Sequence, residues 1–315
     1  MTARATRDWF GEALVSAGAA HPRVAVVDCD LGSATKTGAF AEAFPDRYFQ
    51  CGIAEANAIG VASGLAQEGM RPFVASFGHF LTGKFLEIFQ SIGLNDTGVV
   101  LVGTHAGLAI GKDGPTQMGL RDLALMRTLP NMEILHPADG AETRQMVDYL
   151  AARERPAYLR LCRQPLAEVH DRPFRFVAGR PDIVRAGADI AVVTMGGMVR
   201  VVLDALPPLA EQGIRPSVVS LSSLPVDPDA LRRVCGAHRT VFVVEDHYVT
   251  GGIADEVARA LLELPHPPRF VGHGVRDYGQ AAAPDELYAR YRLDSRSIGE
   301  QIHALAAEIP VGALS

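Results

Sequence analysis

The chain has 315 residues, of which 48% are apolar and 21% charged, and its formal net charge is −6. This is the composition of an ordinary globular protein that is long enough for two domains. It contains no basic run, which argues against a surface for nucleic acid or for an anionic membrane. The N-terminus is amphipathic rather than signal-like, and no apolar run reaches ~18 residues, so we expect a cytoplasmic protein without an export or membrane-spanning segment.

Strands and helices are predicted to alternate through the first half of the chain. The segment Val24–Asp28 is a continuous apolar run, typical of a strand covered on both faces. The alternation predicts a doubly wound α/β domain with a mostly parallel sheet, whose functional loops follow the carboxyl ends of the strands. The predicted strands are 24–28, 47–51, 72–76, 98–103, 132–136 and 157–162, and the predicted helices are 7–19, 54–67, 80–92 and 138–153.

A second alternating unit follows a segment rich in proline and arginine, 167–180, which is typical of a linker. We therefore divide the chain into a first domain of residues 1–170, a linker of residues 171–180 and a second doubly wound domain of residues 181–315. Gly251 and Gly252 open a helix of the second domain and could admit an anion or a neighbouring chain. The predicted strands of this domain are 190–195, 217–221 and 241–245, and its helices are 199–211, 228–235, 253–262 and 297–309.

The four cysteines, Cys29, Cys51, Cys162 and Cys235, are far apart in the sequence. No two of them have the spacing of metal ligands, and a cytoplasmic chain would keep them reduced. We interpret all four as packing residues and predict no metal ligand in this chain.

The stretch from Phe44 to Gln67 changes from a short aromatic strand to a helix rich in alanine and glycine, and Glu55 lies in the first turn of that helix. The simplest interpretation is a carboxylate stabilised by the helix dipole, worth ~0.3–1 kcal/mol. The small neighbours of Glu55 would also let a flat ligand or another backbone approach closely. A carboxyl kept from water there could stay protonated or share a proton with a base.

A glycine-rich loop, 103–119, carries His105, Lys112, Asp113 and Gln117. A long loop inside a compact domain is more often functional than structural. His105 also directly follows a predicted strand, so it is expected at the edge of the sheet where binding sites form.

Six blocks of sequence occur in the order found in a known family. They resemble the C-terminal two thirds of the transketolases, the pyrimidine-binding and C-terminal domains of thiamine-diphosphate enzymes, and they cover almost the whole chain. The blocks are CDLGS (29–33), FPDRYFQCGIAEAN (44–57), SFGHF (76–80), THAGLAIGKDGPTQ (104–117), LRLCRQPL (159–166) and VEDHYVTGG (244–252).

The GDG…N motif, with which this family binds the metal and the diphosphate, does not occur in the chain. The chain therefore resembles one subunit of a split transketolase. The resemblance implies a separately encoded partner that supplies diphosphate binding and the Mg²⁺ or other divalent cation. Thiamine diphosphate would then lie between the two subunits in an α2β2 assembly.

The resemblance also implies roles for residues near the cofactor. Glu55 matches the carboxyl that hydrogen-bonds the pyrimidine ring, which is acid–base work tuned by burial. Phe77 and Phe80 match the aromatic wall that stacks on that ring, and Asp30 is placed with the cofactor. A third family aromatic falls at Gly83, which leaves that side open or filled by Phe85. His79 could reach the substrate or be structural.

For the substrate, Arg7 and Arg163 match two arginines that hold the acceptor's phosphate, and the arginine fork suits a phosphate or sulfonate. His105 matches a histidine of the same group, with a catalytic role as well. The family serine falls near Ala34, so Ser33 or Thr35 must serve. Asp113 matches a carboxylate that contacts sugar hydroxyls, and Gln117 stands where transketolases usually carry histidine, so proton transfer there is in doubt.

The function implied is transfer of a two-carbon ketol unit from a ketose, or its phosphate, to an aldose acceptor, with activity only in the presence of the partner. One alternative is the beta subunit of a decarboxylating enzyme, either a 2-oxo acid dehydrogenase or a relative of deoxyxylulose-phosphate synthase. Another is a non-catalytic regulatory subunit, against which Glu55, Phe77 and Phe80 argue. Glu245, Asp246 and His247 lie in a block that builds subunit interfaces in the family, and we predict a structural role for them.

Overall fold

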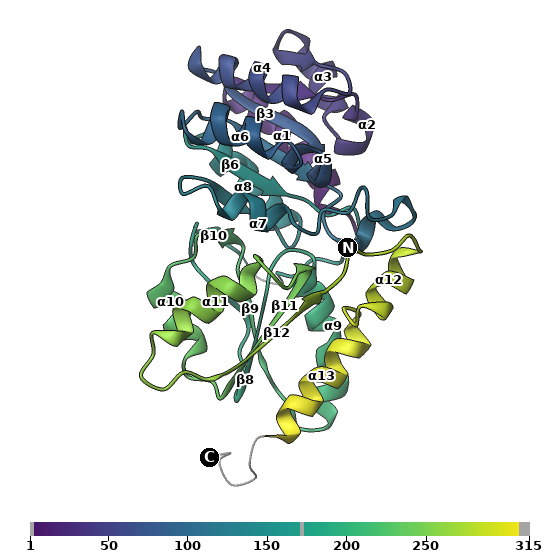
Figure 1. Cartoon of the computed structure of the whole chain (residues 1–315), viewed down its shortest axis with the longest axis vertical. Helices are drawn as coiled ribbons and strands as arrows, with labels where there is room; N and C mark the ends of the chain where they lie inside the picture. Colours follow the sequence, from purple (N-terminus) through teal and green to yellow (C-terminus); the bar gives the residue numbers. More distant parts are fainter. Residues whose placement is uncertain (1–2, 171–172, 309–315) are drawn as a thin grey trace.

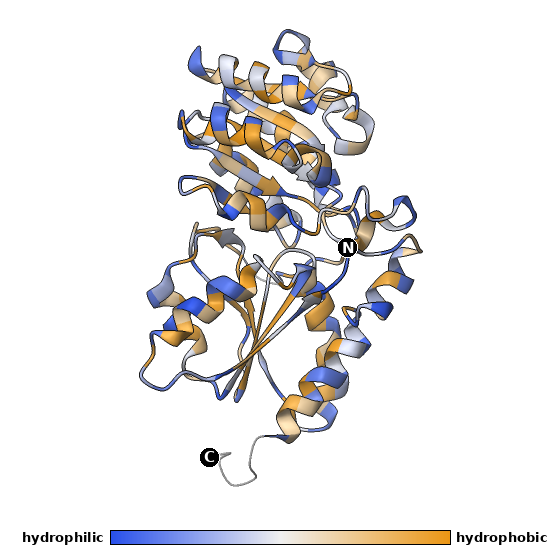
Figure 2. Ribbon diagram, in the orientation of Figure 1, coloured by the Kyte–Doolittle hydropathy of each residue, from blue (hydrophilic) through white to orange (hydrophobic). Residues whose placement is uncertain are grey.

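The computed structural model describes residues 3–170 and 173–308 as two α/β units, each with its own sheet (Figure 1). The outer limits of the two predicted domains, the first two residues of the predicted linker and the last residue of the predicted helix 297–309 lie outside the described residues. Figure 2 shows apolar residues concentrated on the strands and on the helix faces turned toward them. The predicted fold class, two doubly wound units with mostly parallel sheets, is confirmed.

The first sheet has seven strands within the described residues, in the order β10-β5-β6-β4-β3-β1-β2. Every neighbouring pair is parallel except β10 with β5. The strands are β1 (Val24–Asp28), β2 (Tyr48–Gln50), β3 (Arg71–Phe77), β4 (Val100–Thr104), β5 (Glu133–Leu135), β6 (Ala157–Arg160) and β10 (Ser223–Leu224).

Helices cover both faces of this sheet, because alternate strand residues point to opposite sides. Val24 and Val26 pack with α1 and α8, whereas Val27 and Val74 pack with α4 on the other side. The helices and helical turns of this unit are α1 (Thr6–Ala20), α2 (Gly32–Thr35), α3 (Gly38–Ala43), η1 (Pro45–Arg47), α4 (Glu55–Gln67), α5 (Gly78–Thr82), α6 (Phe85–Ile88), η2 (Phe89–Gly93), η3 (Leu108–Asp113), α7 (Asp122–Arg127) and α8 (Gly140–Ala151).

The second sheet has the order β12-β11-β8-β9-β7 in the described chain, with only β7 antiparallel to its neighbour. Helix α9 packs on one face, together with α12 and α13, and α10 and α11 pack on the other. The elements are β7 (Asp182–Arg185), β8 (Ile190–Thr194), α9 (Met198–Glu211), β9 (Ser217–Ser220), α10 (Pro228–Cys235), β11 (Thr240–Tyr248), α11 (Ile253–Leu262), β12 (Arg269–Val275), α12 (Pro284–Arg290) and α13 (Ser295–Ala307).

The two units share one core. Strand β10 belongs to the second unit by sequence but pairs with β5 at the edge of the first sheet. Leu224 of β10 and Val219 of β9 lie in the same apolar cluster as Ile134 of β5 and Met126 of α7. The contact between the units is therefore packed like a domain interior, which fixes the second unit against the first.

One predicted helix is wrong. The segment 80–92 is not a single helix, because α5 ends at Thr82 and the chain restarts at Phe85 before passing into the π-turn η2. The N–H of Gly83 bonds to the carbonyl of His79, which closes α5. Gly83 is itself still helical, with φ at −63°, and the chain leaves the helix at Lys84, with ψ at 44°. The apolar periodicity of the segment concealed this break. Strands β7, β10 and β12 were not predicted.

The segment just before the predicted linker is held against the first unit. Asp139 caps α8 through the N–H of Glu142, and its other oxygen accepts from the N–H groups of Val169 and His170 and from His170 Nδ1 at 2.8 Å. Burial alone would lower the pKa of His170, but the hydrogen bond to Asp139, the ion pair of Nε2 with Asp182 at 3.5 Å and the charge of Glu142 raise it to about 10. His170 is thus protonated and links the first unit to the start of the second by its contacts with Asp139 and Asp182.

Replacing His170 with glutamine is expected to lower the free energy of unfolding by ~1.5–3 kcal/mol, the usual range for a hydrogen bond to a charged group. The pKa of His170 is higher in the folded than in the unfolded chain, so its stabilisation is complete below about pH 6.5 and is lost as the pH rises toward 10. Urea unfolding from pH 6 to pH 10 should show the gap between wild type and His170→Gln closing. The exposed His303, changed to glutamine, is the matched control, and a gap that stays constant over this range would contradict the prediction.

Two simpler findings complete the fold. The four cysteines are unpaired, and three of them are buried, as expected of packing residues. Within residues 3–170 and 173–308, no helix combines the length and apolarity needed to cross a membrane.

Candidate functional site

Glu55 lies where α4 starts, beside the carboxyl end of β3. Its side chain is buried, at 8% relative exposure, and its Oε1 accepts a hydrogen bond of 2.9 Å from Ser76 Oγ on β3. The N–H groups of a first helical turn lack partners within the helix and favour a negative group nearby. Burial, Ser76 and the helix end together hold the carboxyl in one place, as the sequence predicts for an acid that works in a sheltered site.

Two aromatic rings follow Ser76. Phe77 and Phe80 are half-buried, and their rings stack with centroids 5.4 Å apart at an angle of 13°. Phe85 packs instead on the core beside α4, and its ring contacts Phe89. In the described structure it therefore does not fill the place of the third family aromatic. The first of these rings, Phe77, directly follows Ser76 at the end of β3.

His105 directly follows β4 and is held in an unusual backbone conformation, with φ at 56°. Arg7 Nη1 lies 2.7 Å from His105 Nε2, and Thr104 Oγ1 lies 2.9 Å from Nδ1. Because arginine only donates, Nε2 is the acceptor and Nδ1 carries the proton. Burial, then the charges of Arg7, Arg163 and Lys36, lower the pKa of His105 to about 3, so the ring is neutral. Its plane also lies against Phe77, at a centroid distance of 3.9 Å.

Arg7 reaches this site from α1. Its Nη1 also donates to the carbonyl of Ala34 at 3.0 Å, and its buried Nε has no hydrogen-bond partner among the described residues. Thr35 is buried and donates to the carbonyl of Leu31, so it is committed to the turn. Ser33 is exposed in α2 and remains the only one of the two predicted hydroxyls that is free to face a ligand.

The glycine-rich loop is compact and mostly buried around its glycines. It forms the 3-10 turn η3, with Gly107, Gly111 and Gly114 at φ of 75°, 75° and 79°, a region that glycine adopts readily. Arg163 Nη1 bonds to the carbonyl of Ile110 at 3.3 Å, and it lies 3.8 Å from Asp113 Oδ2. The loop thus brings Asp113 beside Arg163, as the predicted substrate site requires.

A cavity of about 500 Å³ opens beside this pair and is lined by Ile110, Lys112, Asp113, Arg163, Gln164 and Pro284, among others. Arg163 and Asp113 are each close to half exposed there. Gln117 is half-buried in the same loop and its N–H bonds to the carbonyl of Gly114.

Asp30 ends the loop after β1 at φ 62°, and its side chain is exposed. Its backbone N–H donates to Gln50 Oε1, while Gln50 Nε2 donates to the buried Asp28. Asp28 also accepts from Thr37 Oγ1 and the N–H of Leu31. Asp28, which sequence analysis missed, therefore fixes the loop that presents Asp30, and its position as the polar end of an apolar strand was the available signal.

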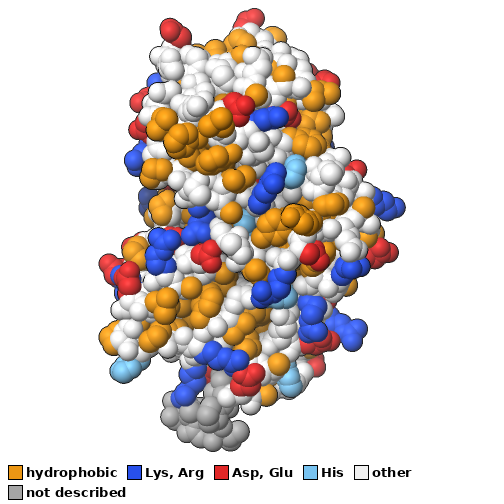
Figure 3. Space-filling model, in the orientation of Figure 1, with side chains coloured by type: hydrophobic (Ala, Val, Ile, Leu, Met, Phe, Trp, Pro, Cys, Tyr) orange, Lys and Arg blue, Asp and Glu red, His pale blue; other side chains and the backbone are white. Residues whose placement is uncertain are grey.

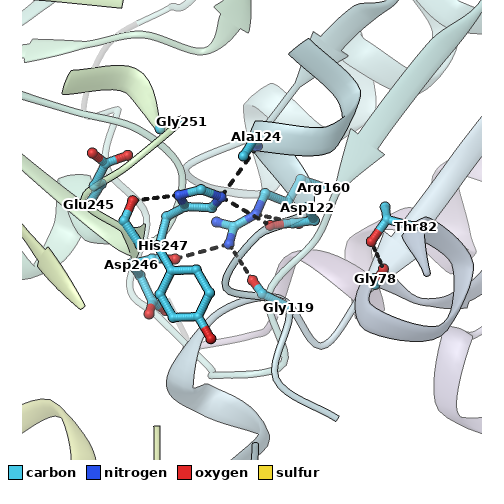
Figure 4. Close-up of polar contacts among 12 residues, drawn as sticks. Gly78, Thr82, Gly119, Asp122, Ala124, Arg160, Glu245, Asp246, His247 and Gly251 are labelled. Atoms are coloured by element: carbon cyan, nitrogen blue, oxygen red, sulfur yellow. Dashed lines mark hydrogen bonds and ion pairs between the residues drawn. The ribbon is translucent and has the colours of Figure 1, made fainter. Parts of the chain in front are cut away.

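A buried ion pair joins the site to the second unit (Figure 4). Arg160 at the end of β6 pairs with Asp122 at 2.8 Å, and its Nη2 donates to the carbonyls of Gly119 and Asp246. The carboxylate of Asp246 accepts from the N–H of Leu108 at 2.9 Å. Glycine is required at Gly107, because a Cβ there would lie 1.9 Å from Asp246 Oδ2. Asp246 therefore has the predicted structural role, within this chain, by clamping the glycine-rich loop.

The glycine pair at the start of α11 does not form an open anion site. Glu245 on β11 accepts from the N–H groups of Ile253 and Ala254, at 2.8 and 3.3 Å, so the helix end is already occupied. A Cβ at Gly252 would lie 1.7 Å from Glu245 Oε2. Gly252 lets this carboxylate approach, whereas a Cβ at Gly251 would lie 2.4 Å from Ala124 Cβ. The helix end therefore holds Glu245, which corrects the expectation that it could admit an anion.

Replacing Arg160 with methionine is expected to cost ~3–5 kcal/mol in the free energy of unfolding, because it strands the fully buried Asp122 without its cation. The double variant Arg160→Met, Asp122→Leu should recover part of this loss, since it leaves no charge behind. Urea unfolding of the full chain measures both. A single variant as stable as wild type would show that the pair does not hold the units together.

Comparisons with known proteins identify the family of the chain. Residues 2–168 match the transketolase pyrimidine-binding domain, and residues 179–298 match the transketolase C-terminal domain. The chain belongs to the transketolase family. The predicted resemblance is thereby confirmed.

Relatives of similar length include two proteins named as transketolase subunits. The chain is 32% identical over 301 residues to the 6-deoxy-6-sulfo-D-fructose transketolase subunit SqwH of Clostridium sp., covering 94% of this chain and 93% of that one. It is 31% identical over 297 residues to an apulose-4-phosphate transketolase subunit of Phocaeicola vulgatus, covering 93% and 95%. A solved structure described as a split gene transketolase, inactive beta4 tetramer, matches with a TM-score of 0.87 at 38% identity, covering 95% and 97%.

Among the described residues, no three His, Cys, Asp or Glu side chains are grouped so that they could hold a metal ion. In this transketolase-family chain the structure joins Arg7, His105 and Phe77 by direct contact and Glu55 with Ser76, the residue before Phe77. Arg163 acts on the pKa of both Arg7 and His105 through its charge. Of the predicted site residues, Phe77, His105 and Arg163 lie at or just after the ends of β3, β4 and β6, whereas Arg7 comes from α1 and Asp30 follows β1.

Proposed function

We propose that this chain is the catalytic subunit of a split transketolase that transfers a two-carbon ketol unit from a ketose to a phosphorylated aldose. Thiamine diphosphate would bind between this chain and a separately encoded subunit. The observation that carries the proposal is the buried Glu55, bonded to Ser76 and placed next to the stacked rings of Phe77 and Phe80. An acid and an aromatic wall in this arrangement suit a flat, nitrogen-containing ring.

The residues at the end of β3 fit the pyrimidine half of thiamine diphosphate. Phe77 and Phe80 would stack on the ring, and Glu55 would hold a proton at its carboxyl and share it with a ring nitrogen. Ser76 orients that carboxyl by donating to Oε1. The cofactor, when bound, supplies a carbon nucleophile of a kind that no amino-acid side chain offers. We assign its diphosphate and the Mg²⁺ or other divalent cation to the partner subunit, and Asp30 to the rim of the cofactor site.

The cationic side of the site supports a phosphorylated acceptor. Arg7 and Arg163 would bind the phosphate, helped by the exposed hydroxyl of Ser33. Asp113 would contact sugar hydroxyls from its place beside Arg163, and Gln117 would contribute only hydrogen bonds because an amide does not transfer protons. His105 is neutral, so it would accept or relay a proton rather than carry charge.

The surface around Glu55 supports docking of the partner subunit. Ile53, two residues before Glu55, is 85% exposed, and Leu86, Phe89 and Leu94 on neighbouring turns are 60%, 38% and 67% exposed. Figure 3 shows apolar side chains gathered over this part of the first unit. Gly60 and Gly64 have no heavy atom near the position of a Cβ, so the exposed face of α4 is smooth enough for close approach. We propose that the diphosphate-binding subunit covers this face in an α2β2 assembly.

The same comparisons support the proposed division of the chain. The first matched segment, 2–168, ends before the proposed linker 171–180, and the second, 179–298, begins at the last two residues of that linker. We retain 1–170 as the pyrimidine-binding domain and 181–315 as the C-terminal domain.

Exchanging Glu55 for glutamine is expected to lower ketol transfer by the reconstituted complex at least ~10³-fold. Glutamine keeps the shape and can still accept from Ser76, but it cannot share a proton, and positioned proton transfer contributes about 10²–10⁴-fold to rates. Coupled assays of ketose cleavage with a phosphorylated aldose acceptor measure the loss. Glu68→Gln, at the exposed end of α4, is the control and should leave the rate unchanged.

Two results would contradict the proposed function. If Glu55→Gln retained full activity, the chain would be a non-catalytic subunit. If the complex released carbon dioxide from pyruvate but transferred no ketol unit between sugars, the decarboxylating alternative would replace the transketolase assignment.

Changing Leu86 to aspartate is expected to weaken association with the partner subunit by at least about tenfold, because burying an unpaired carboxylate in an apolar contact is costly. Analytical ultracentrifugation of the mixed subunits measures this, and thermal unfolding of the separate chain shows that the exposed substitution leaves the fold intact. Leu262→Asp, at a residue 75% exposed on the second unit, is the matched control. If Leu86→Asp and Leu262→Asp associated equally well with the partner subunit, the partner would have to dock on another surface of the chain.

A further inference from the structure

Lys36 lies next to the arginine side of the site, although no motif pointed to it. It follows α2 in a left-handed conformation, with φ at 70°. Its backbone packs on α1 at Gly11, where a Cβ would lie 2.8 Å from both Lys36 Cβ and the Lys36 carbonyl oxygen. Gly11 is one turn after Arg7 on the same face of α1. The close contact therefore fixes Lys36 beside Arg7.

The ammonium group of Lys36 is close to the site and only loosely held. Its Nζ lies 3.3 Å from Asp8 Oδ1, and both side chains are about one third exposed, at 39% and 30%. An exposed pair of this kind is weak and easily exchanged. Lys36 is also near enough for its charge, with those of Arg7 and Arg163, to lower the pKa of His105.

The positive charges around His105 are incompletely matched by carboxylates in the described structure. Arg7 bonds a neutral ring and the Ala34 carbonyl, and its Nε has no partner there. Arg163 lies 3.8 Å from Asp113, beyond normal hydrogen-bond distance. The place of the family's phosphate-binding serine is taken by Ala34, whose side chain has no donor. Compared with the family pattern, the turn after β1 thus lacks one neutral hydrogen-bond donor, the serine hydroxyl, and gains one cation, the ammonium group of Lys36.

We propose that Lys36 is a specificity-determining residue, which completes a three-cation subsite with Arg7 and Arg163 for the dianion of a phosphate monoester. This rests on the proposed function, because the phosphate is taken to be that of the acceptor sugar. Lys36 leaves Asp8 and turns its ammonium to the phosphate, while the arginine forks hold the oxygens.

The third cation, Lys36, makes the subsite discriminate between ligands by their net charge. Coulomb attraction scales with the charge of the ligand, so one more ammonium favours a dianion over a monoanion and does nothing for a neutral sugar. A phosphate monoester has its second pKa near 6 and is a dianion at pH 8, whereas a sulfonate carries a single charge. The subsite therefore prefers a phosphate to a sulfonate of similar shape.

The test uses the full chain and titrates inorganic phosphate and, separately, methanesulfonate at pH 8 by isothermal calorimetry. Wild type should bind phosphate more tightly, and Lys36→Met should weaken phosphate binding about tenfold but methanesulfonate binding only about threefold, as expected for loss of one charged contact. Lys36→Arg should keep most of the preference. Arg233→Met, which removes an exposed cation from α10, is the control. Lowering the pH from 8 to 5 should weaken phosphate binding in wild type more than in Lys36→Met.

Kinetics of the reconstituted complex separate this inference from the proposed function. Lys36→Met should raise KM for a phosphorylated acceptor about tenfold and leave kcat and the KM of a neutral acceptor nearly unchanged. If the complex transfers no ketol unit while phosphate binding depends on Lys36, the proposed function fails and the subsite stands. If Lys36→Met, folded as judged by its thermal unfolding, binds phosphate like wild type, or if wild type binds neither anion or shows no preference between them, the inference is overturned.

Discussion

The buried contact of Arg160 with Asp122 is the constraint on which the site depends. From the end of β6, Arg160 reaches Asp122, the carbonyl that ends the glycine-rich loop at Gly119, and the carbonyl of Asp246 in the second unit. Asp246 in turn holds the start of the same loop at the N–H of Leu108. One guanidinium thereby fixes both ends of the loop. Because Arg163 follows Arg160 by three residues, the clamp also sets where Arg163 meets Asp113.

The candidate site combines two groups of residues with different chemistry, which meet in sequence at Ser76 and Phe77. Ser76 bonds the buried carboxyl of Glu55. Phe77 contacts the tilted imidazole of His105 at a centroid distance of 3.9 Å, and His105 in turn contacts Arg7. Because His105 is neutral, its imidazole can lie near the positive charges of Arg7, Arg163 and Lys36 without adding to their repulsion. The proposed acid and the proposed anion subsite can therefore occupy neighbouring strand ends.

The sequence predicted what depends on local patterns. Apolar runs placed β1, β3, β4, β8 and β11, and the change from aromatic to small residues placed Glu55 at the first position of α4. Predictions of secondary structure were wrong or missing where contacts between residues distant in sequence determine the structure. Glycines in β12, the alternating burial of the edge strand β7 and the two-residue β10 gave no strand signal.

Contacts between residues far apart in sequence could not be predicted from local patterns either. Arg160 and Asp122 are 38 residues apart, and Glu245 reaches the helix end behind Gly252 only because β11 brings it there. The family resemblance supplied Arg7, His105 and Arg163. It could not supply Lys36, whose place beside Arg7 depends on the missing side chain of Gly11.

The exposed apolar surface beside Glu55 links assembly to chemistry. The carboxyl is already buried, but Ile53, two residues before it, is 85% exposed, and the stacked phenylalanines are half open to water. Water at such a wall competes for the proton that a sheltered acid should hold and screens its interactions. A subunit that covers Ile53 and the smooth face of α4 would remove that water and enclose the ring that Glu55 must contact. Docking of the proposed partner subunit would therefore exclude water from the surroundings of Glu55 and also supply the rest of the cofactor site. This is a physical reason to expect activity only in the complex.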